Sequence, residues 1–307
     1  MLKPRALRPG DRIAVVSPAS PFNRDEFDAG VAELRNLGFE AVYDESVFAR
    51  EGYVSGPPGV RAAAIRRALE DPSIAALIAA RGGYGSAQVL PLLDRDEIRR
   101  ARKPFIGYSD VTALLTYLTV GCGLVAFHGP MLDRRLSRGA AGYDAASLLA
   151  AVTASAVPRE LAPEGLEVVR RGEARGPLYG GTITQLLASL ATPYAFDPPA
   201  GAVLLLEEVG ERPYRLDRQL LQLAQANLLG RASAVVVGEL PGCDEPSGEV
   251  RGRDVVTRLL ADFHGPVLIG FPTGHTTGPS TTLPLGVECR VVADGRPRLV
   301  IEETAVE

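Results

Sequence analysis

The chain has 307 residues, of which 46% are hydrophobic and 23% are charged, so it can bury a sizeable core. Its 33 basic and 37 acidic residues leave a formal net charge of −4, and no basic cluster is interleaved with aromatic residues. A nucleic-acid-binding surface is therefore not expected. These values favour a soluble globular protein that acts on a small molecule or a peptide.

The cysteines and the N-terminus indicate the compartment. The three cysteines, Cys122, Cys243 and Cys289, are far apart and have no CxxC spacing, which argues against a disulfide framework and against a zinc site. The first eleven residues become polar before an apolar segment of signal-peptide length can form. We therefore expect a cytoplasmic protein with no metal site and no membrane contact.

The first half of the chain alternates between predicted strands and helices. Asn23, with Glu26 three residues later, resembles a capping box that starts a helix ending at Gly38. This alternation predicts a parallel sheet with both faces covered, in which the loops after the strands bind ligands. The predicted strands are 13–16, 41–43, 74–80, 105–106 and 124–127, and further helices are expected at 61–69, from Ser86 and after Ser109.

Ser109 lies where a short apolar strand gives way to a helical pattern. Phe105 and Ile106 are followed by Gly107, and the apolar spacing after Asp110 is that of a helix. A hydroxyl on such a turn faces the N–H groups of the next helix, which is a suitable place for a nucleophile. The alternative is that Ser109 only caps the helix, because Ser is a preferred N-cap residue.

A glycine-rich loop, Arg81-Gly82-Gly83-Tyr84-Gly85, follows the predicted strand 74–80. Glycine allows positive φ and a close backbone approach to a ligand, so the loop could form an anion-binding nest. It is not a nucleotide-binding motif, because its order is not GxGxxG and no Walker-type Lys follows. A simple tight turn explains the pattern equally well.

The second half of the chain indicates another domain. The rhythm of strand and helix is lost between 136 and about 176, in stretches rich in Gly, Pro and charge. We therefore predict an N-terminal domain at 1–155, a linker at 156–175 and a C-terminal domain at 176–307. The latter should contain strands at 202–206, 234–237 and 267–269, an amphipathic helix at 213–229 and a hairpin turn at Asp294-Gly295.

Glu207 and His275 also follow predicted strands. A nucleophile, a base and a carboxylate that orients the base can converge from such positions. Alternation along an extended chain points only one of Glu207 and Glu208 inward, and it does not decide which one. Of the other two histidines, His264 is expected to cap a helix end, and His128 could contact a ligand or be structural.

Several segments resemble, in order, the motifs of the L,D-carboxypeptidase family of serine peptidases, which also contains the microcin C self-immunity peptidases. The resemblance implies a flavodoxin-like N-terminal domain with a parallel sheet, a β-rich C-terminal domain and an active site at the domain interface. It implies no cofactor and often a homodimer. The segments are 10–20, 81–85, 107–110, 128–130, 206–211, 213–218 and 274–276.

The resemblance also implies roles for individual residues. Ser109 would be the nucleophile, His275 the general base and then acid, and Glu207 the carboxylate that orients the imidazole. An oxyanion hole would be formed by the backbone N–H of Asp110 and of Gly82 or Gly83. One departure is Thr182, where the family more usually has Asn. Further substrate-binding candidates are Arg81, for a terminal carboxylate, Tyr84, His128 and Tyr179.

The implied reaction is removal of the terminal D-alanine from a cytoplasmic murein tetrapeptide during cell-wall recycling. A second possibility within the family is cleavage of an acyl-nucleotide conjugate, although the chain has no Trp with which to stack a base. Outside the family, an α/β-hydrolase esterase is disfavoured because 107–111 breaks the GxSxG pattern. A non-catalytic ligand-binding protein is also compatible with the composition.

Overall fold

The computed structural model describes all 307 residues, and its internal contacts divide the chain into two compact units. Unit 1 comprises Met1–Ser155, Gly278–Leu285 and Ala305–Glu307, and unit 2 comprises Ala156–Thr277 and Gly286–Thr304. Two short segments late in the chain therefore pack with unit 1, whereas the sequence pattern predicted contiguous domains. No helix in either unit is both long and apolar enough to cross a bilayer.

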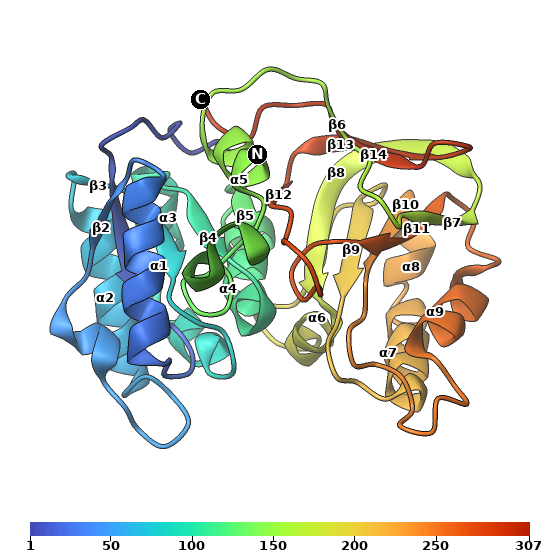
Figure 1. Cartoon of the computed structure of the whole chain (residues 1–307), viewed down its shortest axis with the longest axis horizontal. Coiled ribbons are helices and arrows are strands. Elements are labelled where there is room, and N and C mark those ends of the chain that lie inside the picture. The colour runs from blue at the N-terminus through green and yellow to red at the C-terminus, as the bar shows by residue number, and fades with distance from the viewer. The chain divides into compact units, whose positions relative to one another are not determined.

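Unit 1 is built on a six-stranded sheet with the order β12-β5-β4-β3-β1-β2 (Figure 1). Its first five strands in the sequence are parallel, and the last, β12, is antiparallel to β5. This order confirms the predicted flavodoxin-like arrangement. The strands are β1 (Arg12–Val16), β2 (Glu40–Val42), β3 (Ile74–Ala79), β4 (Phe105–Gly107), β5 (Ala126–His128) and β12 (Leu283–Leu285).

Three of the four helices predicted in unit 1 are α-helices in the structure, and two further α-helices, Arg95–Ala101 and Ala145–Val152, were not predicted. Asn23 caps α1 by accepting hydrogen bonds from the backbone N–H groups of Asp25 and Glu26. The helix expected from Ser86 is instead a 3-10 segment, η2 (Ser86–Leu92), because Pro91 cannot donate the hydrogen bond of an α-helix. The α-helices are α1 (Arg24–Asn36), α2 (Pro58–Glu70), α3 (Arg95–Ala101), α4 (Thr112–Thr116) and α5 (Ala145–Val152).

Four shorter helical segments complete unit 1. Three are 3-10 turns, and the fourth, η4, is a π-helical extension of α4. They are η1 (Glu45–Phe48), η3 (Ser109–Val111), η4 (Tyr117–Gly121) and η5 (Leu136–Ala141). The site described below depends on η3, because this turn connects β4 to α4.

Unit 2 is β-rich, as expected, and contains an eight-stranded sheet with the order β6-β14-β13-β8-β9-β10-β11-β7. Its centre, β8 to β11, is parallel, and the flanking strands are antiparallel. The strands are β6 (Arg159–Leu161), β7 (Glu167–Arg170), β8 (Gly172–Thr182), β9 (Val203–Glu207), β10 (Ala234–Gly238), β11 (Val267–Phe271), β13 (Glu288–Ala293) and β14 (Arg298–Ile301).

The helices of unit 2 are α6 (Ile183–Ser189), α7 (Pro213–Gln225), α8 (Leu228–Arg231) and α9 (Gly252–Leu260). The long helix predicted at 213–229 is divided between α7 and α8. Asn227 separates the two with a φ of 57°, a left-handed conformation that Asn adopts more readily than most residues. The change in chain direction therefore occurs at a residue suited to it.

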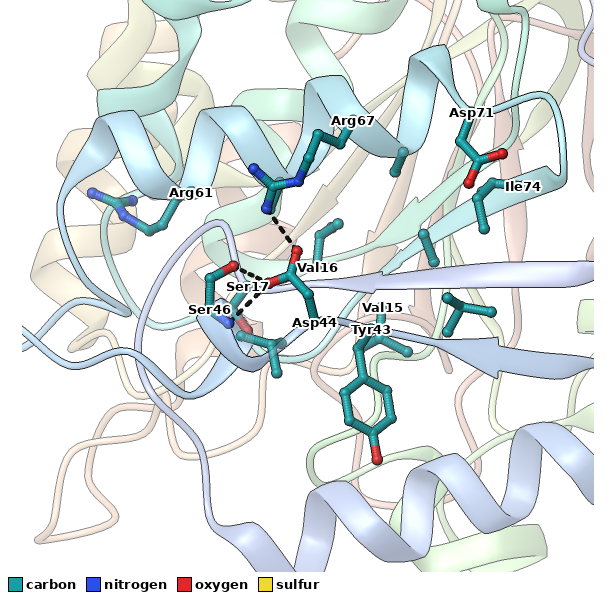
Figure 2. A pocket seen from close by; sticks show the side chains of 15 residues that line it. Val15, Val16, Ser17, Tyr43, Asp44, Ser46, Arg61, Arg67, Asp71 and Ile74 are labelled. Carbon is teal, nitrogen blue, oxygen red and sulfur yellow. Dashed lines mark hydrogen bonds and ion pairs between the residues drawn. The ribbon is translucent and has the colours of Figure 1, made fainter.

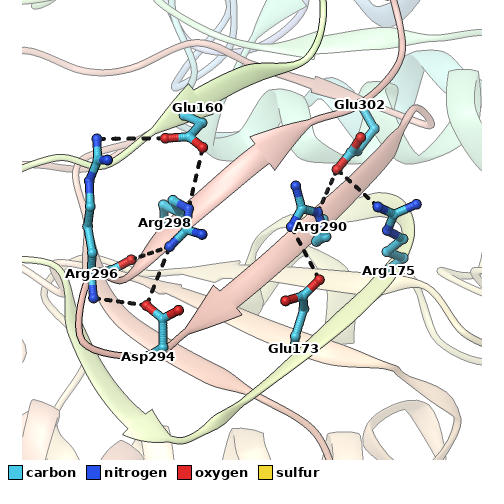
Figure 3. A network of polar contacts seen from close by, with 8 residues as sticks. All are labelled: Glu160, Glu173, Arg175, Arg290, Asp294, Arg296, Arg298 and Glu302. Atoms are coloured by element: carbon cyan, nitrogen blue, oxygen red, sulfur yellow. Dashed lines mark hydrogen bonds and ion pairs between the residues drawn. The ribbon is translucent and has the colours of Figure 1, made fainter.

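The predicted linker at 156–175 is not irregular: it supplies β6, β7 and the first residues of β8. The hydrophobic periodicity of residues 156–175 is weak because these short strands are rich in charged residues. Their charged side chains pair across neighbouring strands (Figure 3), as when Arg290 contacts Glu173 at 3.2 Å and Arg298 contacts Glu160 at 3.6 Å. Cross-strand pairs of this kind support strand pairing where few apolar side chains are available.

A buried carboxyl group lies beside the glycine-rich loop of unit 1. Asp133 is 3% exposed, and its backbone N–H donates to the carbonyl of Ala80 at 2.9 Å. Its carboxylate lies 3.2 Å from the Nε of Arg81. Burial, together with a hydrogen bond to Glu26, raises the pKa of Asp133 to about 7 in spite of the arginine.

This raised pKa predicts a pH-dependent contribution to stability. Protonated Asp133 favours the folded state below its ordinary pKa of 3.8, and this contribution is lost as the pH rises through about 7. Urea unfolding of the wild type and of Asp133→Asn should therefore diverge, with the wild type losing on the order of 4 kcal/mol relative to the variant as the pH rises from about 4 to about 7. A difference that does not change with pH would contradict the assignment.

Candidate active site

Ser109 is held in a strained backbone conformation between β4 and α4. Its φ is 62°, a left-handed value that is costly for a residue with a side chain. Gly107 makes the turn possible, because a Cβ there would lie 2.7 Å from the Cγ1 of Val111. Ser109 is the first residue of η3 and does not occupy the cap position, which belongs to Tyr108. The capping interpretation of Ser109 therefore does not hold.

The glycine-rich loop lies directly against this serine. A Cβ on Gly82 would be 2.9 Å from the Cβ of Ser109 and 3.2 Å from its Oγ. Gly83 has a φ of 96°, and its neighbour Ser20 comes from the loop after β1. The N–H of Ser20 donates to the carbonyl of Gly82 at 3.0 Å, and the hydroxyl of Ser20 accepts from the N–H of Tyr84 at 3.0 Å. The loops after β1 and β3 thus support each other beside the hydroxyl.

Asp110 is fixed by the segment that follows the same loop. Its carboxylate accepts a hydrogen bond of 2.8 Å from the N–H of Ser86, and the hydroxyl of Ser86 donates to its carbonyl. The side chain is buried, so its charge is compensated inside the protein. The backbone N–H of Asp110 lies in the first turn of η3, where N–H groups have no helical acceptor and can bind an anion.

The other candidates in unit 1 differ in accessibility. Arg81 pairs with the buried Asp133 and also donates to the carbonyl of Pro21 at 2.9 Å, so its charge is already partly compensated. Tyr84 is 52% exposed and packs edge-to-face on Tyr53. His128 is fully buried in β5, between β4 and β12. Of the two roles considered for His128, the burial of its ring fits the structural one.

In unit 2, Glu207 and His275 are hydrogen-bonded. Glu207 is the last residue of β9 and is fully buried, and its Oε2 lies 2.8 Å from the Nδ1 of His275 and accepts from that residue's backbone N–H at 2.9 Å. The hydroxyl of Thr182 donates to the other carboxylate oxygen. Because Nδ1 faces the carboxylate, Nε2 is the ring nitrogen that can take part in proton transfer. The His275 side chain is 17% exposed.

Glu208 has a different surrounding. Its Oε2 accepts from the backbone N–H of Thr184 at 2.9 Å and from the hydroxyl of Thr184 at 2.7 Å. The carboxylate of Glu208 therefore accepts hydrogen bonds from the first turn of α6, and burial raises its pKa. The alternation predicted along the strand places Glu207 toward His275 and Glu208 toward α6.

Two contacts around this pair were missed by sequence reasoning. Glu239 follows β10, and its Oε2 accepts from the N–H and the hydroxyl of Thr277, at 2.9 and 2.8 Å, which fixes the loop that carries His275. Its position after a strand was the available signal. Thr182 was noticed only as a departure from a family pattern. Tyr179, expected to bind substrate, is 5% exposed within β8, so the structure offers little of it to a ligand.

The comparisons with known proteins match segments of both units. Residues 13–129 match the model of the LD-carboxypeptidase N-terminal domain, and residues 175–291 match that of the LD-carboxypeptidase C-terminal domain. A putative carboxypeptidase from Streptomyces coelicolor is 36% identical over 96% of this chain and 94% of its own length. A probable murein peptide carboxypeptidase from Bacillus subtilis is 31% identical over 93% of this chain and 90% of its own length.

Solved structures show the same fold. The microcin C7 self-immunity protein, in its inactive mutant ligand-free state, superposes with a TM-score of 0.90 and 25% identity over the whole of both chains. The matched segments include the turn with Ser109 and the strand with Glu207. The chain therefore belongs to the LD-carboxypeptidase family of peptidases.

Proposed function

We propose that this protein is a serine L,D-carboxypeptidase that removes the terminal D-alanine from murein tetrapeptides in the cytoplasm, as part of peptidoglycan recycling. In this proposal Ser109 is the nucleophile, His275 is the general base and then acid, and Glu207 orients the imidazole. The backbone N–H groups of Asp110 and of Gly82 or Gly83 form the oxyanion hole. The proposal requires Ser109 and His275 to act on the same substrate molecule. We also propose that the protein forms a homodimer.

The observation that carries the proposal is the hydrogen bond between Nδ1 of His275 and the fully buried carboxylate of Glu207, at 2.8 Å. A carboxylate in this position selects the tautomer with its proton on Nδ1 and stabilises the imidazolium that forms during catalysis. Nε2 can then accept the proton of a serine hydroxyl. The strained turn at Ser109 supports the proposal, since backbone strain of this kind is common at active sites.

The chemistry follows from these positions. His275 takes the proton of the Ser109 hydroxyl as its oxygen attacks the scissile carbonyl, and the N–H donors of the oxyanion hole stabilise the negative charge that develops. When the C–N bond breaks, His275 gives the proton to the nitrogen of the departing D-alanine. A water molecule, deprotonated by His275, then hydrolyses the acyl ester and restores the hydroxyl of Ser109.

The choice of a murein peptide is supported by the curated relative from Bacillus subtilis, whose name includes that substrate class. A second candidate is cleavage of an acyl-nucleotide conjugate, which is favoured by the structural likeness to the microcin C7 self-immunity protein. The chain lacks Trp, the side chain with the largest stacking surface for a base. We therefore rank the peptide substrate first.

Incubation with the tetrapeptide L-Ala-γ-D-Glu-meso-diaminopimelate-D-Ala should release D-alanine, measured with D-amino acid oxidase. Ser109→Ala should lower kcat by at least about 10³-fold, because the acyl-enzyme can no longer form. Thr112→Ala, on the following helix, is a matched hydroxyl control. Full activity of the Ser109 variant would eliminate the proposed nucleophile, and turnover of an aminoacyl sulfamoyl adenosine in place of the peptide would favour the second candidate.

The two adjacent glutamates provide a matched pair of variants. Glu207→Gln should lower kcat by about 10³- to 10⁴-fold with little change in KM, because the amide no longer selects the correct imidazole tautomer. Glu208→Gln should keep kcat within about tenfold and mainly lower the unfolding free energy, by about 1 kcal/mol, through the weakened first turn of α6. Steady-state kinetics and urea unfolding of both variants measure this, and the reverse pattern would exchange the two roles.

A further inference from the structure

Arg61 is a buried charged residue of unit 1 that no step of the proposed reaction uses. It is 3% exposed, and Figure 2 shows it on the same helix, α2, as Arg67. Arg67 pairs with the carboxylate of Asp44 at 2.6 Å, whereas every hydrogen-bond acceptor of Arg61 is an uncharged oxygen. Removing a guanidinium from water is costly unless its charge is compensated, so a carboxylate farther away must contribute.

The acceptors of Arg61 come from several loops around the glycine-rich loop. Its Nε donates to the carbonyl of Gly56 at 2.9 Å, and one terminal nitrogen donates to the carbonyl of Gly85 at 2.8 Å. The same terminal nitrogen donates to the carbonyl of Pro18, and the other donates to the side-chain oxygen of Gln88. Pro18 follows β1, Gly85 follows β3, and Gly56 precedes α2. One buried side chain therefore holds three separate loops together.

The peptide group between Gly85 and Ser86 connects Arg61 to a buried carboxylate. Its carbonyl oxygen accepts a hydrogen bond from Arg61. Its N–H donates to the carboxylate of Asp110 at 2.8 Å. The C=O and N–H of a trans peptide point in opposite directions, so the guanidinium lies at the negative end of the peptide dipole and the carboxylate at the positive end. Both hydrogen bonds are charge-assisted, and together they form an ion pair that is bridged by one peptide group.

The charges of the two residues support this bridge. Burial lowers the pKa of the Arg61 guanidinium, and the negative charges of Asp110 and Glu51 act in the opposite direction. Asp110 is itself 3% exposed. The hydroxyl of Ser86 also donates to the backbone carbonyl of Asp110, so Ser86 is held to the turn that carries the nucleophile by two contacts. Each buried charge is therefore compensated in part by the other, through the end of the glycine-rich loop.

We propose that Arg61 is a positioning residue for the oxyanion hole, acting through the peptide group of residues 85–86. The inference rests on the proposed function, in which N–H groups of Asp110 and of Gly82 or Gly83 stabilise the transition state. These donors belong to two separate segments, the turn after β4 and the loop after β3. Arg61 holds the loop against the turn, so the donors keep a fixed relative position. Donors of this kind contribute most when they are fixed before the reaction begins.

Arg61→Lys tests this role, because an ammonium keeps the charge but lacks the planar set of donors. It should lower kcat for release of D-alanine from the tetrapeptide by about 10- to 100-fold, since small misplacements of catalytic groups are costly. KM should change by less than about threefold, because the oxyanion hole acts on the transition state. Arg67→Lys is the matched control and should keep kcat within about twofold. An unchanged kcat in Arg61→Lys would overturn the proposal, as would a fall in kcat that only follows a loss of folded protein in circular dichroism.

A double-mutant cycle tests the bridge itself. Asp110→Asn removes the charge at the other end of the peptide group and should lower kcat by about tenfold. When it is combined with Arg61→Lys, kcat should stay within about threefold of the worse single variant, because both changes break the same bridge. Effects that multiply would show that the two residues act independently and would overturn the proposal. If Arg61→Lys does not fold, Asp110→Asn decides the outcome, since an unchanged kcat in that variant would also overturn it.

Hydrogen exchange at the backbone amide of Ser86 gives a readout that needs no substrate. This N–H donates to a buried carboxylate, so it should exchange slowly in the wild type and at least about tenfold faster in Arg61→Lys. Arg67→Lys should leave the exchange rate unchanged. A failure of the proposed function would appear separately, as a wild type that releases no D-alanine, and exchange at Ser86 would then still decide whether Arg61 holds the loop. Equal exchange rates in Arg61→Lys and the wild type would overturn the proposal.

Discussion

The buried hydrogen bond between Glu207 and His275 is the constraint on which the rest of the site depends. A carboxylate removed from water is costly unless its oxygens are satisfied, and here they accept from Nδ1 and the backbone N–H of His275 and from the hydroxyl of Thr182. The neighbouring strand must also leave room: a Cβ on Gly238 would lie 2.9 Å from the Cβ of Glu207. Strand pairing, a glycine and a hydroxyl together fix the carboxylate that holds the imidazole of His275 through its Nδ1.

The two units use the same structural principle. In each, functional groups follow parallel strands: Ser109 and the glycine-rich loop after β4 and β3, and Glu207 and His275 after β9 and β11. The carboxyl ends of parallel strands gather loops at one edge of a sheet, where ligands commonly bind. In unit 1, placing Ser109 on this turn strains its backbone. The hydrogen bonds between the buried residues Asp110 and Ser86 hold the turn in place.

Much of the fold could be predicted because most of the parallel strands in the two sheets are short apolar runs bounded by Gly, Pro or polar residues. The serine turn was predictable because Gly107 and Asp110 mark its limits. Contacts that depend on the direction of a side chain could not be predicted. The sequence does not show that Glu208 points toward α6, that Asp133 forms an ion pair with Arg81, or that His128 is buried. The strands at 156–175 were missed because their pairing relies on charged side chains that contact each other across strands. Such residues do not produce the alternation of apolar and polar residues by which a strand is recognised in a sequence.

The most direct test of the account is the protonation of His275 in the ligand-free protein at neutral pH, observed by ¹⁵N NMR of the labelled imidazole. The buried carboxylate should hold the proton on Nδ1 and leave Nε2 unprotonated, and Glu207→Gln should abolish this preference. A ring that carries its proton on Nε2 in the wild type could not accept one from a serine, and this result would contradict the central claim.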